Sequence, residues 1–217
     1  ADCLEREFGR RPFIFYTNGY QIYMVDGVGG PARRVFGYYS LHELHSLIVR
    51  RKLGPIEDTR VNKEISDRYF IQNACTKVCE TYSNFRRKAL SVMATGTGKT
   101  RFAISLVDIL MRNNWVKNVL FLADRKELVG QAKKAFIKYL PNATICAINE
   151  VSSNEREYDS NIILSTYPTM LNLIDTDDKK FGIGRFDLII IDECHRSCYN
   201  KYQAIFNYFD SLVLGLT

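Results

Sequence analysis

The glycine-rich segment Met93–Thr100 has the residue types of a phosphate-binding loop. Its backbone N–H groups can curve around phosphate oxygens at four positions: Thr95, Gly96, Thr97 and Gly98. Lys99 can neutralise the outer phosphates, and the hydroxyl of Thr100 can bind Mg²⁺. The alternative is an ordinary glycine-rich turn, and Met93 stands where the usual pattern has glycine. An apolar run before the loop and an amphipathic stretch after it favour phosphate binding.

A second candidate site follows the apolar run Leu188–Ile191, which ends in Asp192 and Glu193. Ligands of parallel sheets bind at the carboxyl ends of the strands, and the phosphate loop would occupy such an end too. We expect Asp192 to hold Mg²⁺ through water, and Glu193 to orient and deprotonate an attacking water. Phosphoryl transfer depends mainly on such positioning and charge neutralisation. The alternative, two acids that cap a strand by chance, is disfavoured by the loop upstream.

The elements that would position these residues alternate regularly from residue 89 onward. Short apolar runs, typical of strands buried on both faces, occupy 89–94, 119–123, 144–148, 161–165, 188–191 and 212–216. Amphipathic stretches, typical of helices, occupy 99–112, 126–139, 169–175 and 201–209. This alternation predicts an α/β fold, a parallel sheet flanked by helices.

The first part of the chain predicts a small α+β segment instead. Asn18-Gly19 lies between two β-rich runs and predicts a hairpin, because both residues tolerate a positive φ. Ser40 and Glu43 predict a capping box that begins a helix running to about Lys52. A polar connector, 56–67, and a second helix, 69–82, follow.

Composition limits the functional classes. The 217 residues are 46% hydrophobic and 25% charged, which suits one large or two modest domains with a core that needs no disulfide or metal. The net charge of +6 permits a nucleic-acid partner without requiring one. No apolar run approaches the ~18 residues of a membrane span.

The six cysteines include two pairs with C-x3-C spacing, Cys75/Cys79 and Cys194/Cys198. Zinc sites usually have C-x2-C spacing, so we expect reduced and mostly buried thiols. Such thiols fit a reducing cytoplasm.

The order of these motifs resembles superfamily 2 helicases and translocases. Ala94–Thr100 and Asp192–His195 are similar to motifs I and II of that superfamily. Further similar segments are Phe121–Gln131 (motif Ia), Ser165–Met170 (the next DNA-contacting motif), Val213–Thr217 (the start of motif III) and Arg68–Gln72 (the adenine-reading glutamine motif). The resemblance implies a RecA-like fold that binds ATP and Mg²⁺.

The first part resembles the R subunit of type I restriction–modification enzymes, in the segment that joins nuclease to motor. The similar segments are Ala1–Glu5, Arg11–Gly19, Pro31–Arg34 and Leu41–Lys52, with Asp192–Ser197, Tyr199–Tyr202 and Tyr208–Asp210 further on. The resemblance implies that residues 1–55 are the tail of a nuclease-side domain with its linker. Residues 56–217 would then be the first RecA-like ATPase lobe, ending within motif III. No nuclease residues can be assigned.

Such R subunits hydrolyse ATP to move duplex DNA, and they work in the bacterial or archaeal cytoplasm with specificity and methyltransferase subunits. The resemblance therefore implies these partners, no membrane, and a nuclease and a second RecA lobe elsewhere in the same protein. Because the second lobe supplies an arginine finger worth ~10³–10⁵ in rate, the isolated chain is expected to turn over poorly.

The resemblance also implies roles for single residues near the ATP site. Gln72 could read the adenine edge, because its amide both donates and accepts hydrogen bonds. Arg68 would lie beside the nucleotide. Tyr69 and Phe70 could flank the base, or equally could belong to the core. His195 could couple the ATP site to the DNA side, or be an ordinary polar residue with satisfied hydrogen bonds.

The resemblance implies contacts with the DNA backbone for four residues just beyond strand ends: Arg125, Gln131, Thr166 and Thr169. Arg125 could equally be a solvated surface residue. Three basic clusters, Arg33-Arg34, Arg50–Lys52 and Arg86–Lys88, are more often solvated faces than a DNA groove.

Two alternatives remain for the whole chain. One is a superfamily 2 helicase of another pathway, including the motors of type III restriction enzymes. The other is a non-catalytic nucleotide-binding scaffold that keeps the phosphate loop for binding only. The presence of Glu193 argues against the second.

Overall fold

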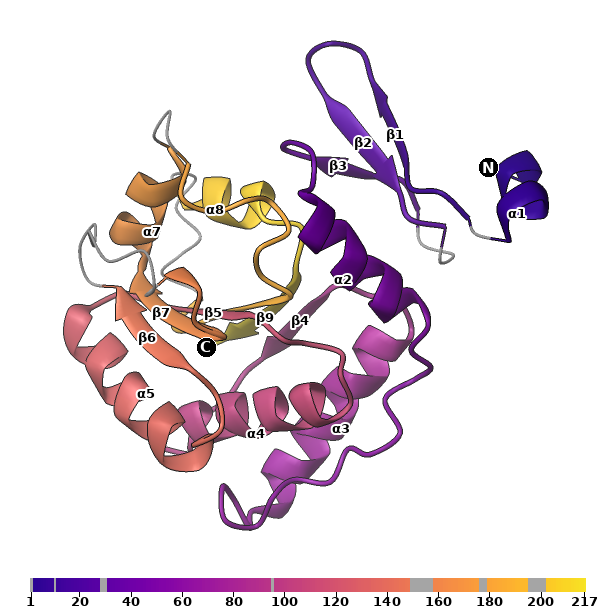
Figure 1. Cartoon of the computed structure of the whole chain (residues 1–217). Helices are drawn as coiled ribbons and strands as arrows, with labels where there is room; N and C mark the ends of the chain where they lie inside the picture. The colour runs from indigo at the N-terminus through magenta and orange to yellow at the C-terminus, as the bar shows by residue number, and fades with distance from the viewer. Residues whose placement is uncertain are drawn as a thin grey trace.

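The parallel sheet of the fold has six strands, in the order β4-β9-β8-β5-β7-β6. The computed structural model in Figure 1 describes residues 2–9, 11–27, 31–94, 96–148, 158–175, 179–194 and 202–217. The sheet strands are β4 (Lys88–Ser91), β5 (Val119–Ala123), β6 (Ile145–Ile148), β7 (Ile162–Thr166), β8 (Leu188–Ile191) and β9 (Leu212–Leu216). Every residue of β5, β7, β8 and β9 is buried, as expected when helices cover both faces. The predicted α/β fold is confirmed.

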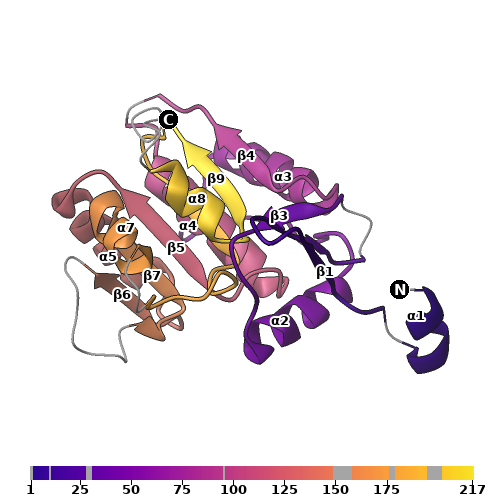
Figure 2. The ribbon, with the colours of Figure 1, turned by 90° about the horizontal axis from the view of Figure 1, so that it is seen from above.

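Helices lie on both sides of this sheet (Figures 1 and 2). The helices are α1 (Asp2–Phe8), α2 (Leu41–Arg51), α3 (Tyr69–Ser83), α4 (Lys99–Arg112), α5 (Lys126–Tyr139), α7 (Tyr167–Ile174) and α8 (Gln203–Tyr208). One face packs against α3, α4 and α5, with Phe102 and Phe136 fully buried in that core. The other packs against α7 and α8, and residues of the first part of the chain, such as Met24 and Tyr39, complete that second core.

The predicted hairpin is confirmed, but its loop is longer than Asn-Gly alone. The strands β1 (Ile14–Thr17) and β2 (Ile22–Val25) pair antiparallel, and Thr17 faces Ile22 across a loop of residues 18–21. Only Gly19 has a positive φ in this loop, +90°. The carboxamide oxygen of Asn18 instead accepts hydrogen bonds from the backbone N–H groups of Tyr20 and Gln21. The asparagine therefore acts through its side chain rather than through a left-handed backbone.

The capping box at the start of α2 is confirmed as well. The hydroxyl of Ser40 accepts from the N–H of Glu43 at 3.3 Å, and the Glu43 carboxylate accepts from the N–H of Ser40 at 2.7 Å. Two elements were not predicted, α1 and the strand β3 (Arg33–Val35), which pairs with β2.

Partly buried ion pairs join the first part of the chain to the large sheet. Asp210, just before β9, accepts from Arg33 Nε at 2.8 Å and from Arg87 Nη2 at 2.7 Å. The hydroxyl of Tyr39 also donates to Asp210, and Arg50 of α2 pairs with Asp187, just before β8. The predicted domain boundary near residue 55 thus falls between two parts that pack closely; it remains a prediction.

Two of the cysteines lie on the buried face of α3. The thiols of Cys75 and Cys79 are free and fully buried. Burial raises the pKa of both thiols, that of Cys79 to about 12. Cys3, in contrast, is exposed. None of the described helices is long and apolar enough to cross a bilayer.

Candidate functional site

The phosphate loop connects the end of β4 to the start of α4. Gly96 and Gly98 have φ values of +78° and +104°, which only glycine adopts without strain. Gly98 is the N-cap of α4, and the N–H and hydroxyl of Thr97 both donate to the carbonyl of Ala94. The loop is therefore shaped by positive-φ glycines at a helix N-terminus, where the helix dipole favours anions. Thr95 lies outside the described residues.

Lys99 and Thr100 are the first two residues of α4, and both are half-buried beside the loop. The side chain of Lys99 keeps only 16% exposure. It points across the sheet edge, and its Nζ lies 3.3 Å from Oε1 of Glu193. The structure thus brings together the two residues that were predicted to carry the chemistry.

The acidic pair follows β8 in a tight turn. Glu193 has a φ of +51°, a conformation that costs a non-glycine residue roughly 1–3 kcal/mol. Its N–H donates to the carboxylate of Asp192 at 3.1 Å, and the next N–H, that of Cys194, donates to the carbonyl of Leu216 at 2.8 Å. The hydroxyl of Tyr167 donates to the Asp192 carbonyl at 2.8 Å. These bonds fix the strained turn that directs Glu193 toward Lys99.

The end of β9 lies between the phosphate loop and the acidic turn. The N–H of Met93 donates to Thr217, and that of Cys194 donates to Leu216, both at 2.8 Å. A Cβ on Gly215 would lie 3.0 Å from Leu90 and 3.2 Å from the Cys194 sulfur. The absence of a side chain at Gly215 therefore lets the two flanking segments approach the same strand.

Burial raises the pKa of Asp192, and the neighbouring charge of Glu193 raises it further. The N–H of Glu193 and the ammonium of Lys99 act in the opposite direction. A cation near Asp192 would favour its ionised form in the same way.

The donor set suits Mg²⁺, which prefers oxygen ligands and commonly takes one or two from the protein and the rest from phosphates and water. Asp192 offers a carboxylate, and Thr100 offers a hydroxyl at the start of α4. In the described part of the chain no three His, Cys, Asp or Glu side chains cluster into an all-protein metal site. The residues therefore fit a metal that arrives with its nucleotide.

Arg68, at the N-cap of α3, lies beside the loop. Its Nη1 donates to the carbonyl of Thr97, and the same atom would lie 3.3 Å from a Cβ on Gly98. Ile71 is fully buried one turn later, 3.7 Å from that same Cβ position. Sequence reasoning missed Ile71, although its i, i+3 spacing from Arg68 puts both residues on one helix face.

The structure directs the amide of Gln72 away from the loop. Its Nε2 donates to the Thr59 carbonyl at 2.8 Å and to the Thr76 hydroxyl at 3.2 Å. Its Oε1 accepts from the N–H of Val61 at 2.7 Å. The amide thus ties the 56–67 connector to α3, so it is not positioned here to read adenine. Tyr69 is 79% exposed, and its ring meets that of Phe70 edge-on, with the ring centroids 5.8 Å apart.

The predicted DNA-contacting residues divide into two groups. Arg125 and Gln131 are exposed, before and within the first half of α5. Thr166 and Thr169, in contrast, are only 6% and 8% exposed, and their hydroxyls lie 2.9 Å apart. The two hydroxyls are enclosed between β7 and α7. In this packing neither side chain is accessible for direct contact with a DNA phosphate. His195 lies outside the described residues.

The basic clusters are not simply solvated faces. Arg33, Arg50 and Arg87 form the partly buried ion pairs with Asp210 and Asp187 described above. These three arginine charges are therefore neutralised by carboxylates within the fold, which the sequence pattern alone did not indicate.

Comparison with known proteins agrees with this geometry. Residues 64–217 match the family model described as type III restriction enzyme, res subunit. The type I restriction enzyme EcoAI endonuclease subunit of Escherichia coli is 37% identical over 159 residues, 70% of this chain and 19% of that protein. The chain therefore spans about a fifth of the length of this relative.

Two solved structures show the same fold. A fragment of a putative HsdR subunit of a type I restriction enzyme from Vibrio vulnificus YJ016 has a TM-score of 0.54 at 23% identity, and the match covers 100% of this chain and 39% of that one. The SWI2/SNF2 ATPase core domain of Sulfolobus solfataricus has a TM-score of 0.59 at 17% identity, covering 76% and 34%. Because the matched range 64–217 contains both the phosphate loop and the acidic turn, the chain belongs to the type III restriction enzyme, res subunit family.

Proposed function

We propose that this chain is the first motor lobe of an ATP-dependent DNA translocase, in the R subunit of a type I restriction enzyme. The observation that carries the proposal is the contact between Lys99 and Glu193, 3.3 Å apart at the carboxyl edge of the parallel sheet. A cation that can bind phosphate and a carboxylate that can orient water are the two groups that ATP hydrolysis needs from this side.

Each group would have a defined task. Lys99 would turn from Glu193 to the outer phosphates, while backbone N–H groups of residues 95–98 would enclose them. Thr100 and Asp192 would hold Mg²⁺, which when bound neutralises charge on the phosphates. Glu193 would then be released to orient the attacking water and accept its proton. Arg68 would keep the loop in shape through the Thr97 carbonyl.

The type I assignment rests on the relative's name together with the first part of the chain. The Escherichia coli relative is an endonuclease subunit, and the Vibrio fragment, a putative HsdR subunit, matches across the whole chain. Duplex DNA, specificity and methyltransferase subunits, and a second RecA lobe and nuclease in the same protein, are the partners that this assignment implies.

A second candidate is the motor of a type III restriction enzyme, which the description of the matching family favours. Translocation and unwinding can be distinguished with two DNA substrates. A translocase that moves along a duplex displaces a third strand bound to it, whereas a helicase separates the two strands of the duplex itself. We expect a longer form that carries both lobes to displace the third strand and not to unwind the duplex.

The proposal is tested in that two-lobe form by DNA-stimulated ATP hydrolysis. Replacement Lys99→Ala should abolish measurable turnover, because the outer phosphates lose their cation. Equal hydrolysis by the parent and the Lys99→Ala protein would exclude the assignment. The 217-residue chain alone should bind Mg·ATP and turn over poorly, since the arginine finger of a second lobe contributes ~10³–10⁵ in rate.

A further inference from the structure

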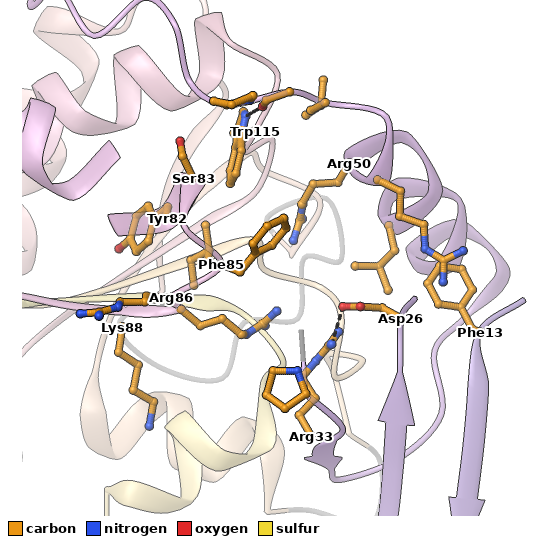
Figure 3. A pocket seen from close by; sticks show the side chains of 18 residues that line it. Phe13, Asp26, Arg33, Arg50, Tyr82, Ser83, Phe85, Arg86, Lys88 and Trp115 are labelled. Atoms are coloured by element: carbon orange, nitrogen blue, oxygen red, sulfur yellow. Dashed lines mark hydrogen bonds and ion pairs between the residues drawn. The ribbon is translucent and has the colours of Figure 1, made fainter. Parts of the chain in front are cut away.

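A cavity of about 630 Å³ lies between the first part of the chain and the sheet (Figure 3). Its lining includes Lys88 and Leu212, the first residues of β4 and β9. It therefore opens at the amino ends of strands whose carboxyl ends carry the ATP site. Its volume falls in the range of small-molecule sites, ~300–1,000 Å³. Nothing in the proposed ATPase chemistry uses it.

Arginines around this cavity outnumber the carboxylates that pair with them. Five line it, Arg33, Arg50, Arg51, Arg86 and Arg87. Three carboxylates form ion pairs with them: Asp26, Asp187 and Asp210. Burial lowers the pKa of Arg87 most; the charge of Asp210 raises it, and the charges of Arg33 and Arg50 lower it again. The cluster therefore has an electrostatic excess that an anion would relieve.

Two of these arginines, Arg51 and Arg86, form no ion pair with a carboxylate among the described residues, and only Arg51 of the two is partly buried. Arg51 is therefore the informative one. Its guanidinium stacks 3.6 Å from the centre of the Phe13 ring, and Nη1 donates to the Arg11 carbonyl. Its Nε and Nη2 are buried and have no hydrogen-bond partner among the described residues. Burying charged donors without acceptors is unfavourable, so a turn of the Arg51 side chain that brings Nε and Nη2 to an acceptor in the cavity would be favourable.

The opposite wall is aromatic. Phe85 has a φ of +59°, unusual for a bulky side chain, and the residue is 60% exposed. In Figure 3 the Phe85 ring lies beside Arg50 and below Trp115, among the residues that line the cavity. Trp115 donates from Nε1 to the Gly54 carbonyl at 3.3 Å, which fixes the indole against the same space. A strained residue that holds an aromatic ring in a cavity is typical of ligand sites.

We propose that this cavity binds a nucleoside monophosphate unit, either a free nucleotide or the unpaired end of a nucleic-acid strand. Guanidinium groups match the geometry of phosphate oxygens, and aromatic rings accept any base by stacking. Because the walls come from both the first part of the chain and the sheet, the ligand would hold the two together. The site is independent of the ATP site.

The single tryptophan of the chain, Trp115, lines the cavity, so its fluorescence reports binding there. The titration uses AMP and the chain with Lys99→Ala, which weakens binding at the phosphate loop and leaves the cavity intact. A loss of AMP binding at the cavity is thereby distinguished from a loss of nucleotide binding at the phosphate loop. We expect a saturable change in Trp115 emission and a higher melting temperature with AMP.

Two variants test the residues. Arg51→Gln removes the unpaired cation without breaking an ion pair, and Phe85→Asn removes the ring while keeping a residue that tolerates a positive φ. Each should weaken AMP binding roughly 10-fold or more. Arg34→Gln is the matched control, because Arg34 also stacks on a phenylalanine, Phe36, but is exposed and outside the cavity.

A 5′-phosphorylated single strand, added as a competitor of AMP, tests whether the cavity takes a strand end or a free nucleotide. Competition supports a strand end, and its failure while AMP still binds supports a free nucleotide. The proposal is overturned if AMP changes neither the emission nor the melting temperature. It is also overturned if inorganic phosphate acts as strongly as AMP, or if Arg34→Gln weakens binding as much as Arg51→Gln.

Discussion

Lys99 Nζ lies 3.3 Å from Glu193 Oε1, although 94 positions separate the two residues in the chain. Their side chains are 16% and 33% exposed, so the pair is accessible to a phosphate that arrives from solvent. A phosphate would compete with the carboxylate for the ammonium. Under the proposed function, the release of Glu193 would therefore depend on nucleotide binding.

Replacement Glu193→Gln separates binding from hydrolysis. The amide removes the competing negative charge but cannot accept a proton from water. We expect Mg·ATP to bind the variant at least as tightly as the parent, measured by calorimetry on the 217-residue chain. Hydrolysis in the two-lobe form should fall by about 10²–10⁴, the usual contribution of a general base. Equal hydrolysis by the two proteins would instead favour the nucleotide-binding scaffold.

Replacement Gln72→Ala tests whether this residue reads adenine or holds the connector. Loss of its three hydrogen bonds should lower the free energy of unfolding by about 1–3 kcal/mol, measured by urea denaturation. The ratio of ATP to GTP affinity should stay unchanged. Gln131→Ala, at an exposed helix position, is the control and should leave stability unchanged. A selective loss of ATP affinity would restore the adenine-reading role.

Local pattern predicted much of the fold and the centre of the site. The strand bounds of β5, β8 and β9 and the helix bounds of α4 and α5 agree with the apolar runs and helical periods of the sequence. These elements are buried on fixed faces, so their patterns are strong. Lys99 and Glu193 could be placed together because both follow the carboxyl ends of parallel strands.

The remaining features depend on contacts between distant parts of the chain. The basic residues of β3 form a strand because Met24 and Tyr23 pair with them and because Asp210, 177 positions away, neutralises Arg33. In the same way, a connector that packs on α3 turns the amide of Gln72 from the phosphate loop. Neither arrangement follows from the periodicity of apolar residues along the local sequence.

Asp210 should make the stability of the chain fall in acid. Burial alone would raise its pKa, but the charges of Arg87 and Arg33 and the hydrogen bonds from Arg33 and Tyr39 outweigh burial and hold it below its ordinary value. The ionised carboxylate therefore stabilises the fold above the unfolded-state pKa of ~3.9, and this contribution is lost as pH falls through the lower folded-state value.

Replacement Asp210→Asn checks this dependence by urea denaturation at neutral and acid pH. Leaving the partly buried Arg33 and Arg87 without their carboxylate should cost about 3 kcal/mol at neutral pH, and the difference from the parent should shrink in acid. Asp2→Asn, in a pair whose side chains are 43% and 76% exposed, should change stability by less than about 1 kcal/mol. A constant difference at all pH values would contradict the assignment.

The exposed and buried candidates for DNA contact should behave differently when replaced. Arg125 is 67% exposed at its side chain and lies at the start of α5, so Arg125→Ala should weaken duplex binding by the two-lobe form. Its slope of log affinity against log salt should fall by about one, as expected for one lost phosphate contact. Thr166→Val breaks the enclosed hydroxyl pair with Thr169 and should lower stability while leaving that slope unchanged. If Thr166→Val reduces the slope and Arg125→Ala does not, the DNA path follows β7 and α7, and the enclosed pair must open when DNA binds.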